Sequence, residues 1–220
     1  MITLDIVSDP ICPWCYIGKH KLDLALAELG SNPFDISWRM FRLNPDMPPE
    51  GVDRRTYLEG KFGGPEGAAR VYGQIAAAGE AAGLSMKLDD ITRTPATLDA
   101  HRLIHWARAT GNQTAVVQQL FSRYFERGED ISDHAVLLDT AESACMERPV
   151  IERLLSGDAD RDVLEKEEAA ARETGITGVP CFIIGGRYVL QGAQDTGTWK
   201  RVIGELGALT DTTSGGLGIL

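Results

Sequence analysis

The chain has 220 residues, 43% of them hydrophobic and 25% charged, and a formal net charge of −10. This composition is typical of globular proteins that bury a core, and the length suits one domain with a large insertion or two small domains. The acidic charge argues against a nucleic-acid partner, because phosphate binding needs clustered Lys and Arg.

The first forty residues predict a strand, a helix and a second strand. Residues 2–7 begin with alternating apolar and polar side chains, and residues 34–40 alternate in the same way, which predicts two strands. Between them, four apolar residues share one face of a helix that Gly30 is expected to end. They are Leu22, Ala25, Leu26 and Leu29. Such a βαβ unit pairs its strands in parallel with a right-handed crossover.

From about Arg54 to Thr174 the pattern is helical, with no convincing strand. At least four helices are expected here, and three of them show an apolar face at helical spacing. The faces consist of Ala100, Leu103, Ile104 and Ala107; of Val117, Leu120, Phe121 and Tyr124; and of Leu138, Ala141 and Cys145. We therefore expect Cys145 to pack in the core.

Strand character returns at the segment CFIIGGRYVLQ, where two β-rich runs flank Gly185 and Gly186. Two glycines in that place predict a hairpin with a two-residue turn of the primed type. A last amphipathic helix follows. Its apolar face consists of Trp199, Val202, Ile203 and Leu206. The tail TDTTSGGLGIL is of low complexity, and we expect residues 211–220 to be loose.

The stretch SDPICPWCYIG places Cys12 and Cys15 three residues apart at the start of the first predicted helix. Three interpretations compete: half of a metal site, a redox disulfide, or two cysteines that fill space. At the mouth of a helix, the exposed N–H groups and the helix dipole favour a thiolate over a thiol. Pro13 fits the first helical turn, where its missing N–H would be unpaired anyway.

This placement favours the redox interpretation. Spacing of three residues on a helix brings the sulfurs close enough to bond. Cys12 would be the more exposed thiol and would attack a substrate disulfide. Cys15, one turn further inside, would then resolve the mixed disulfide.

The other two interpretations fit the sequence less well. A zinc site needs four ligands, and neither a second Cys-X-X-Cys nor a zinc-finger spacing among the four histidines accompanies the pair. Two purely structural cysteines would have no reason to lie at the junction of a strand and a helix. Four cysteines are also too few for a disulfide scaffold.

A second signal is the segment TGVPCFII, in which Pro180 opens a β-rich run and cannot donate a hydrogen bond to the sheet. Together, CPWC at 12–15 and the Val179–Pro180 pair resemble the thioredoxin superfamily, specifically its DsbA-like branch with a helical domain inserted after the second strand. The resemblance implies that the Val179–Pro180 peptide bond is cis. It also implies that Pro180 faces Cys12 and holds extended backbone against which a substrate segment pairs.

The resemblance extends to the cytosolic FrnE-like group. The segments FRLNPDMP, TLDAHRLIHWA, LFSRYFERGEDISD and LQGAQ look like pieces of that group, and the set covers most of residues 2–206. Related kappa-class glutathione transferases and 2-hydroxychromene-2-carboxylate isomerases have serine where Cys12 stands. A glutathione-dependent isomerase or transferase is therefore the alternative function. A partner-binding module that uses the pair as a redox switch is a third.

Four further residues have two interpretations or depart from the group. Cys181 stands where relatives tend to have an aromatic residue, and we expect it to point away from Pro180 and to be buried and inert rather than redox-active. Ala96 stands where relatives commonly have Asn, so a polar contact to substrate or glutathione would be missing. Trp14 is expected to be exposed, either contacting substrate or packing on the inserted helices. His105 fits a solvated polar helix face better than a substrate cleft.

The sequence thus predicts an α/β protein, a thioredoxin fold with an inserted all-helical domain. Residues 1–50 and 160–210 would form the thioredoxin-like domain and residues 51–159 the inserted domain. The expected function is thiol-disulfide exchange. The candidate site residues are Cys12, Cys15 and Pro180 as catalytic residues and Pro13, Trp14, Val179 and His101 as substrate-binding residues.

No metal or organic cofactor is expected, and the partners would be protein disulfides or glutathione as a co-substrate. No apolar run is long enough to cross a bilayer, and the start MITLDIVS lacks the basic and apolar regions of a signal peptide. We therefore expect a cytoplasmic protein without a membrane or nucleic-acid partner. A homodimer is compatible with the sequence.

Overall fold

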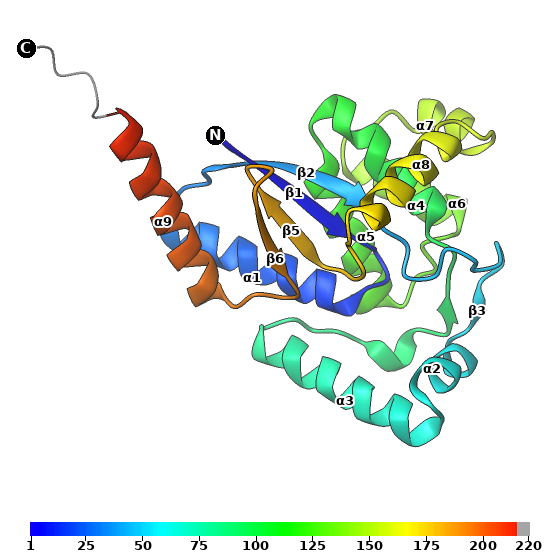
Figure 1. The fold of residues 1–220 in the computed structure, drawn as a ribbon. Helices are drawn as coiled ribbons and strands as arrows, with labels where there is room; N and C mark the ends of the chain where they lie inside the picture. The colour runs from blue at the N-terminus through cyan, green and yellow to red at the C-terminus, as the bar shows by residue number, and fades with distance from the viewer. Residues whose placement is uncertain (215–220) are drawn as a thin grey trace, which may run out of the picture.

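The structure is a computed structural model, and it describes residues 1–214 of the chain. Its central sheet has four strands: β1 (Ile2–Ser8), β2 (Phe34–Met40), β5 (Cys181–Ile184) and β6 (Tyr188–Gln191). Their order is β2-β1-β5-β6, with β1 and β2 parallel and the other pairs antiparallel (Figure 1). The predicted parallel unit and the predicted hairpin are therefore both confirmed.

Two helices lie against one face of this sheet: α1 (Pro13–Leu29) and α9 (Thr196–Ser214). Trp199 of α9 packs edge-on against Phe34 and Phe182, with ring centroids 6.3 and 4.9 Å away. α1 ends at Gly30 as predicted, because Gly30 adopts the left-handed conformation with φ 64°. The prediction that Leu29 belongs to the buried face is wrong, since this residue in the last turn of α1 is 41% exposed.

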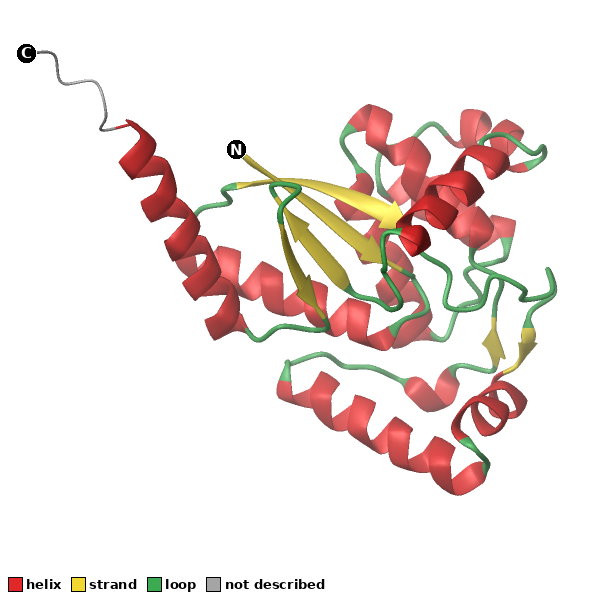
Figure 2. Ribbon diagram, in the orientation of Figure 1, coloured by secondary structure: helices red, strands yellow, loops and turns green. Residues whose placement is uncertain are grey.

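The helices between β2 and β5 gather beside and below the sheet (Figure 2). They are α2 (Arg54–Phe62), α3 (Pro65–Ala81), α4 (Leu98–Trp106), α5 (Gln113–Arg127), α6 (His134–Ser143), α7 (Arg148–Leu155) and α8 (Arg161–Glu173), with the short 3-10 helices η1 (Leu88–Asp90) and η2 (Ala107–Thr110). Two strands of two residues, β3 (Val52–Asp53) and β4 (Arg93–Thr94), also pair here. The expectation of no strand in this region is therefore wrong, because two residues are too few to leave a period in the sequence.

The hydrophobic core runs without a break from the sheet into the inserted helices. Gln113, at the start of α5, is buried and joins three elements. Its side-chain oxygen accepts the Trp38 N–H of β2 at 3.2 Å, and its amide nitrogen donates to the Ile104 carbonyl of α4 at 3.1 Å. The helices of the insertion are thus bonded directly to the edge of the sheet that β2 forms.

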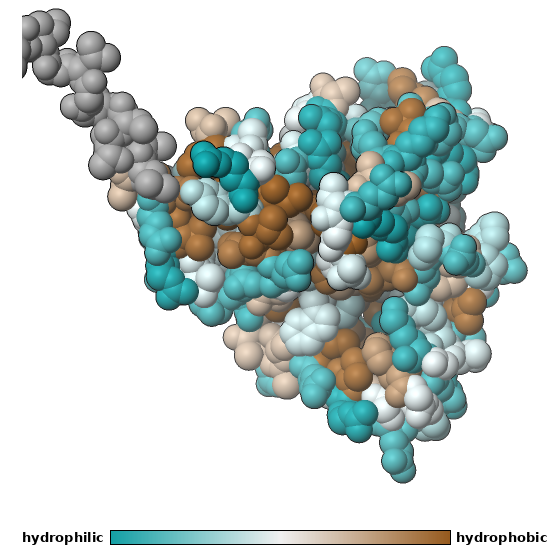
Figure 3. Space-filling model, in the orientation of Figure 1, coloured by the Kyte–Doolittle hydropathy of each residue, from teal (hydrophilic) through white to brown (hydrophobic). Residues whose placement is uncertain are grey.

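The second face of the sheet is covered only in part. Val7, Phe41 and Cys181 form a small buried cluster there, and the Arg172 guanidinium of α8 lies 3.9 Å from the centroid of the Phe41 ring. Further along this face the Arg39 Nε donates to the Asp5 carboxylate at 2.7 Å. Figure 3 shows brown apolar residues at the surface between α9 and α8. No described helix is long and apolar enough to cross a membrane.

Two local expectations at element ends need correction. In the hairpin, Gly185 and Gly186 both have positive φ and Arg187 N–H donates to the Ile184 carbonyl at 3.1 Å, as a primed turn requires. The loop nevertheless has three residues, because pairing resumes at Tyr188. In the tail, α9 continues to Ser214, so residues 211–214 are helical, and residues 215–220 lie outside the described residues.

Cys145 was expected in the core, and that expectation is wrong. α6 already ends at Ser143, and Cys145 adopts φ 58°, in the left-handed region. Its neighbours Ala144 and Met146 are buried, whereas Cys145 itself is exposed. The helical spacing that predicted an apolar position for Cys145 does not apply to it, because the helix ends two residues before it.

The packing of α1 on α5 gives a test of the core. Phe121, fully buried, stacks on Tyr16 of α1 at 5.1 Å between ring centroids. We expect Phe121→Ala to lower the free energy of unfolding by about 3–5 kcal/mol, because it leaves a cavity. The control Leu29→Ala should change it by less than about 0.5 kcal/mol, because Leu29 is exposed. Urea denaturation measures both, and equal losses would contradict the assigned packing.

Candidate active site

The two cysteines lie where β1 meets α1. Cys12 is the residue just before the helix, with extended backbone (φ −86°, ψ 112°), and Pro13 is its first residue, as predicted. The Cys12 N–H donates to the Asp9 carbonyl at 2.9 Å, which closes the turn between strand and helix. The Cys12 carbonyl accepts the N–H groups of Cys15 at 3.1 Å and Tyr16 at 3.3 Å. Cys12 therefore stands at the positive end of the α1 dipole.

Both thiols are buried, Cys12 with 3% of its surface exposed and Cys15 with 2%. The expected contrast between an exposed Cys12 and a buried Cys15 is therefore absent. The segment before β5 covers it, and the Cys12 thiol donates to the Val179 carbonyl at 3.7 Å. Trp14, between the two cysteines, is exposed as predicted.

The segment over Cys12 contains a cis Val179–Pro180 bond, as the resemblance implied. Pro180 is buried against α1, and Gly18 is the residue of α1 that lets it come so close. A Cβ on Gly18 would lie 3.3 Å from Pro180 Cγ, 3.3 Å from Ala193 Cα and 3.4 Å from the Phe182 ring. The two contacts at 3.3 Å would be tighter than ordinary van der Waals packing.

The surroundings of Cys15 shift the pKa of its thiol. Burial raises the pKa of the Cys15 thiol well above its ordinary value, and the adjacent Cys12 sulfur raises it further. The Ser8 hydroxyl and the Asp9 N–H bond to the Cys15 sulfur and act in the opposite direction. The net effect favours the protonated form of Cys15.

Asp9, which sequence reasoning missed, is fully buried beside this pair. Its two carboxylate oxygens accept the N–H of Ile11 at 3.2 Å and that of Leu43 at 2.7 Å, and the Thr97 hydroxyl also bonds to it. Burial outweighs these bonds and raises the pKa of Asp9 to about 7. The only signal in the sequence was an acidic residue between an apolar strand and the cysteine motif.

His101, a predicted substrate-binding residue, is buried against Asp9 rather than open to a substrate. Its Nε2 lies 3.8 Å from the Asp9 Oδ1 and has no hydrogen-bond partner, while the ring bonds to the Phe41 backbone. Burial lowers the pKa of His101 to about 3, so the imidazole is neutral and the contact is not an ion pair. At 3.8 Å the contact is also longer than a hydrogen bond.

The remaining cysteines lie apart from the pair. Cys181 is fully buried with Val7 and Phe41, on the opposite side of its strand from Phe182, as predicted. Burial raises the pKa of its thiol. Cys145 is exposed at the far end of α6. Among the described residues, no group of three or more His, Cys, Asp or Glu side chains is placed to hold a metal ion.

The fold and this turn define a thioredoxin-like protein whose cysteine pair opens the first helix of a βαβ unit. The chain belongs to the DSBA-like thioredoxin domain family, which matches residues 3–204. No curated protein matches it. Among solved structures, a probable DsbA oxidoreductase from Streptomyces coelicolor is similar, with 28% identity and a TM-score of 0.81. The match covers 100% of this chain and 93% of that one.

Two other solved structures share the fold at lower identity. The cytosolic disulfide reductase DsbM from Pseudomonas aeruginosa is 20% identical, with a TM-score of 0.67 over 94% of this chain and 99% of that one. A 2-hydroxychromene-2-carboxylate isomerase is 15% identical, with a TM-score of 0.70 over 98% of this chain and 100% of that one. The two structures share this fold, and the names of the two proteins give different activities, a disulfide reductase and an isomerase.

Gly18 gives a test of the close packing at the site. We expect Gly18→Ala to lower the free energy of unfolding by about 1–2 kcal/mol, because overpacking outweighs the higher helix propensity of alanine. The matched control is Gly73→Ala in the middle of α3, where a Cβ would meet nothing within 4 Å. That variant should gain about 0.5–1 kcal/mol. Thermal or urea unfolding compares them, and a stabilising Gly18→Ala would contradict the assigned contact.

Asp9 should make stability depend on pH. An unfolded Asp9 titrates near 3.8 and the folded one near 7, so between these values the native state holds a proton that the unfolded state has lost. The contribution of Asp9 to the free energy of unfolding should therefore fall as pH rises through this range, by at most about 4 kcal/mol. Asp9→Asn should remove this fall.

Urea denaturation of both proteins from pH 5 to 8 measures the difference. His101 acts in the opposite direction between its folded pKa of about 3 and its ordinary value of 6.5, but it does so in both proteins, so the difference between wild type and Asp9→Asn isolates the contribution of Asp9. A difference between wild type and Asp9→Asn that stays flat or grows in favour of the wild type with rising pH would contradict the assignment.

Proposed function

We propose that this protein is a thiol-disulfide oxidoreductase in which Cys12 attacks and Cys15 resolves. The observation that carries the proposal is the asymmetry of the pair: Cys12 stands at the mouth of α1, and Cys15 holds its proton beside it. DSBA-like family membership supports the same chemistry. Cys12, Cys15 and Pro180 are the proposed catalytic residues.

In the first step the Cys12 thiolate attacks one sulfur of a substrate disulfide. The substrate S–S bond breaks, a Cys12–substrate disulfide forms, and the other substrate sulfur leaves as a thiolate that takes up a proton. The Val179 carbonyl, which accepts the Cys12 thiol before the reaction, lies on the segment where an extended substrate would bind. Pro13 and exposed Trp14 flank the sulfur and are proposed to contact the substrate.

In the second step Cys15 loses its proton and attacks the Cys12 sulfur. Once Cys12 is in the mixed disulfide, its negative charge no longer raises the pKa of Cys15, whereas the Ser8 hydroxyl and the Asp9 N–H still bond to the Cys15 sulfur. The second substrate thiolate leaves, and Cys12 and Cys15 form the disulfide. The substrate is reduced by two electrons and the protein is oxidised. A dithiol or two thiols, such as glutathione, would reverse this.

His101 has no place in this mechanism as a substrate-binding residue, because it is buried behind the turn. It packs beside Asp9 instead. Protein disulfides and glutathione are the proposed partners, and a DsbM structure has been solved with glutathione. The cytoplasmic location, the absence of a cofactor and the homodimer stay predictions.

Replacement of the resolving thiol tests the proposal. We expect Cys15→Ser to lower turnover in insulin reduction or glutathione-disulfide exchange by roughly 100-fold or more, because the mixed disulfide on Cys12 cannot be resolved from within. The mixed disulfide should accumulate and be identified by mass spectrometry. The matched control is Cys145→Ser, which removes an exposed thiol far from the pair and should keep full activity.

The same variant, Cys15→Ser, distinguishes the oxidoreductase from the glutathione-dependent isomerase. A glutathione-dependent isomerase does not need the second thiol, since relatives carry serine even at the first position. Two results together would show that the isomerase is the correct function. They are full glutathione-dependent isomerase activity in Cys15→Ser and no dithiol activity in the wild-type protein. Trapped protein disulfides on Cys12 would identify protein substrates, and trapped glutathione would identify the small thiol as the partner.

A further inference from the structure

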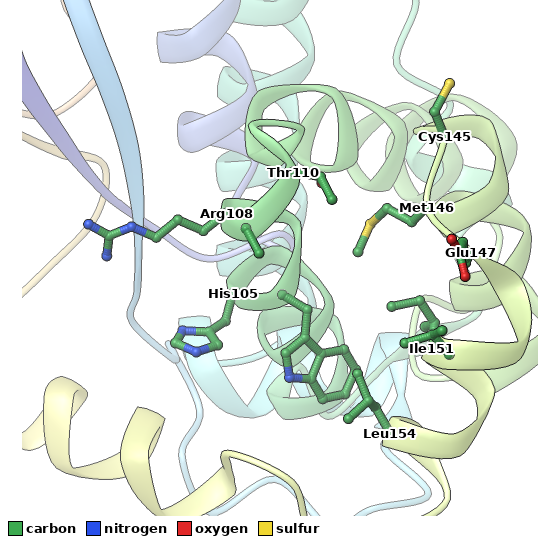
Figure 4. A pocket seen from close by; sticks show the side chains of 11 residues that line it. His105, Arg108, Thr110, Cys145, Met146, Glu147, Ile151 and Leu154 are labelled. Atoms are coloured by element: carbon green, nitrogen blue, oxygen red, sulfur yellow. The ribbon is translucent and has the colours of Figure 1, made fainter.

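A cavity of about 730 Å³ lies away from the two thiols, between the α4–η2 segment and the α6–α7 segment (Figure 4). None of the residues that line it belongs to the Cys12 turn. Its floor and walls are apolar. They consist of Trp106, Ala109, Met146, Val150, Ile151 and Leu154. The volume falls in the usual range of about 300–1,000 Å³ for small-molecule sites.

The cavity lies at the opposite end of α4 from the redox turn. Thr97, just before α4, bonds to Asp9, whereas Trp106 is the last residue of the helix. At 1.5 Å per residue these ends are roughly 12–14 Å apart. The two places share one helix and no lining residue.

A buried arginine holds the two walls in position. Arg102 of α4 has no exposed surface, and its guanidinium donates to the carbonyls of Leu154 at 2.7 Å, Gly157 at 2.7 Å and Ala159 at 2.8 Å. Those carbonyls belong to the end of α7 and the loop after it. One of these bonds joins α4 to α7 and two join α4 to the following loop, all from a charged donor, and together they hold the two walls apart.

The same arginine fixes the aromatic wall. The Arg102 guanidinium lies 4.9 Å from the centroid of the Trp106 ring, and the Trp106 indole N–H donates to the Asp160 carboxylate at 2.8 Å. One face and the polar edge of the indole are thus occupied. The other face of the indole is therefore a fixed apolar surface that lines the cavity.

The lining determines what the cavity can hold. The indole N–H is already paired, and the Thr110 hydroxyl donates to the Ala107 carbonyl at 3.2 Å. His105 also lines the cavity, and in Figure 4 its ring is directed away from Met146 and Ile151. Charged Arg108 and Glu147 stand at the rim, and in Figure 4 Arg108 extends away from the apolar floor. Over the apolar floor an ionic ligand would lose its hydration without gaining a partner. A flat ring suits the indole face and the Met146 sulfur.

We propose that this cavity is a binding site for an uncharged, largely apolar small molecule with a planar ring system. The site is independent of disulfide exchange at Cys12. Its shape is set before any ligand binds, because the Arg102 bonds and the Trp106–Asp160 bond are internal to the protein.

A pair of fluorescent probes tests the chemistry. N-phenyl-1-naphthylamine is uncharged, and 8-anilino-1-naphthalenesulfonate has the same ring system with a sulfonate. We expect saturable binding of the neutral probe to the full-length protein, with a Kd at least about tenfold lower than that of the sulfonate. Equal or tighter binding of the sulfonate, or no saturable binding of the neutral probe, would overturn the proposal.

A matched pair of variants tests whether the probe binds in this cavity. Val150 lines the cavity and is 39% exposed, and Val163 on α8 is 40% exposed and does not line it. Both should accept lysine without loss of fold, which circular dichroism and thermal unfolding check. Val150→Lys puts a charge and a long side chain into the cavity and should raise the Kd of the neutral probe at least about tenfold. Val163→Lys should leave the Kd within about twofold, and equal effects of both would overturn the assigned place.

Energy transfer gives a second readout that does not depend on those variants. Tryptophan emission overlaps probe absorption, so a probe in the cavity should take excitation from Trp106. Transfer at saturating probe should fall in Trp106→Phe and persist in Trp14→Phe. The opposite result would place the probe at the Cys12 turn, where Trp14 is exposed, and would overturn the proposal.

Discussion

The close packing of α1 against the segment that carries Pro180 is the constraint on which the rest of the candidate site depends. Because Gly18 has no side chain, Pro180 and Ala193 occupy the space beside the second turn of the helix. Cys12 stands at the first turn of the same helix, so the same approach puts its thiol against the Val179 carbonyl. Burial of both thiols, and the proton held by Cys15, follow from this covering.

The polar contacts of the site join the redox turn to the inserted helices. The Asp9 carboxyl is bonded to Leu43 after β2 and to Thr97 at the start of α4, two segments far from it in sequence. Such bonds favour the ionised form and burial disfavours it, and burial dominates. The turn that carries Cys12 is thus held by a carboxyl whose pKa lies near neutrality, with a neutral His101 beside it.

Helix α4 borders two places with opposite chemistry. Its first turn lies by the thiols, where hydroxyl, amide and carboxyl groups bond to one another, and its last residue, Trp106, forms a wall of an apolar cavity. Arg102 spaces the cavity walls through carbonyls on α7 and the following loop. A thioredoxin-type fold can therefore carry a second site in its insertion without altering the polar contacts around Cys12.

The sequence by itself determined the βαβ unit, the hairpin, the final helix and the place of CPWC at a helix mouth, because those features rest on local periods and on residues such as Pro13 and Gly30 with a local preference. The resemblance supplied the place of the Val179–Pro180 segment. Only the tertiary structure decided that Cys12 is buried, because the residue that covers it lies 167 positions away. The same holds for Asp9, whose burial comes from distant partners. The exposure of Cys145 was decided where α6 ends, by a left-handed residue that breaks the helical period on which the sequence pattern depends.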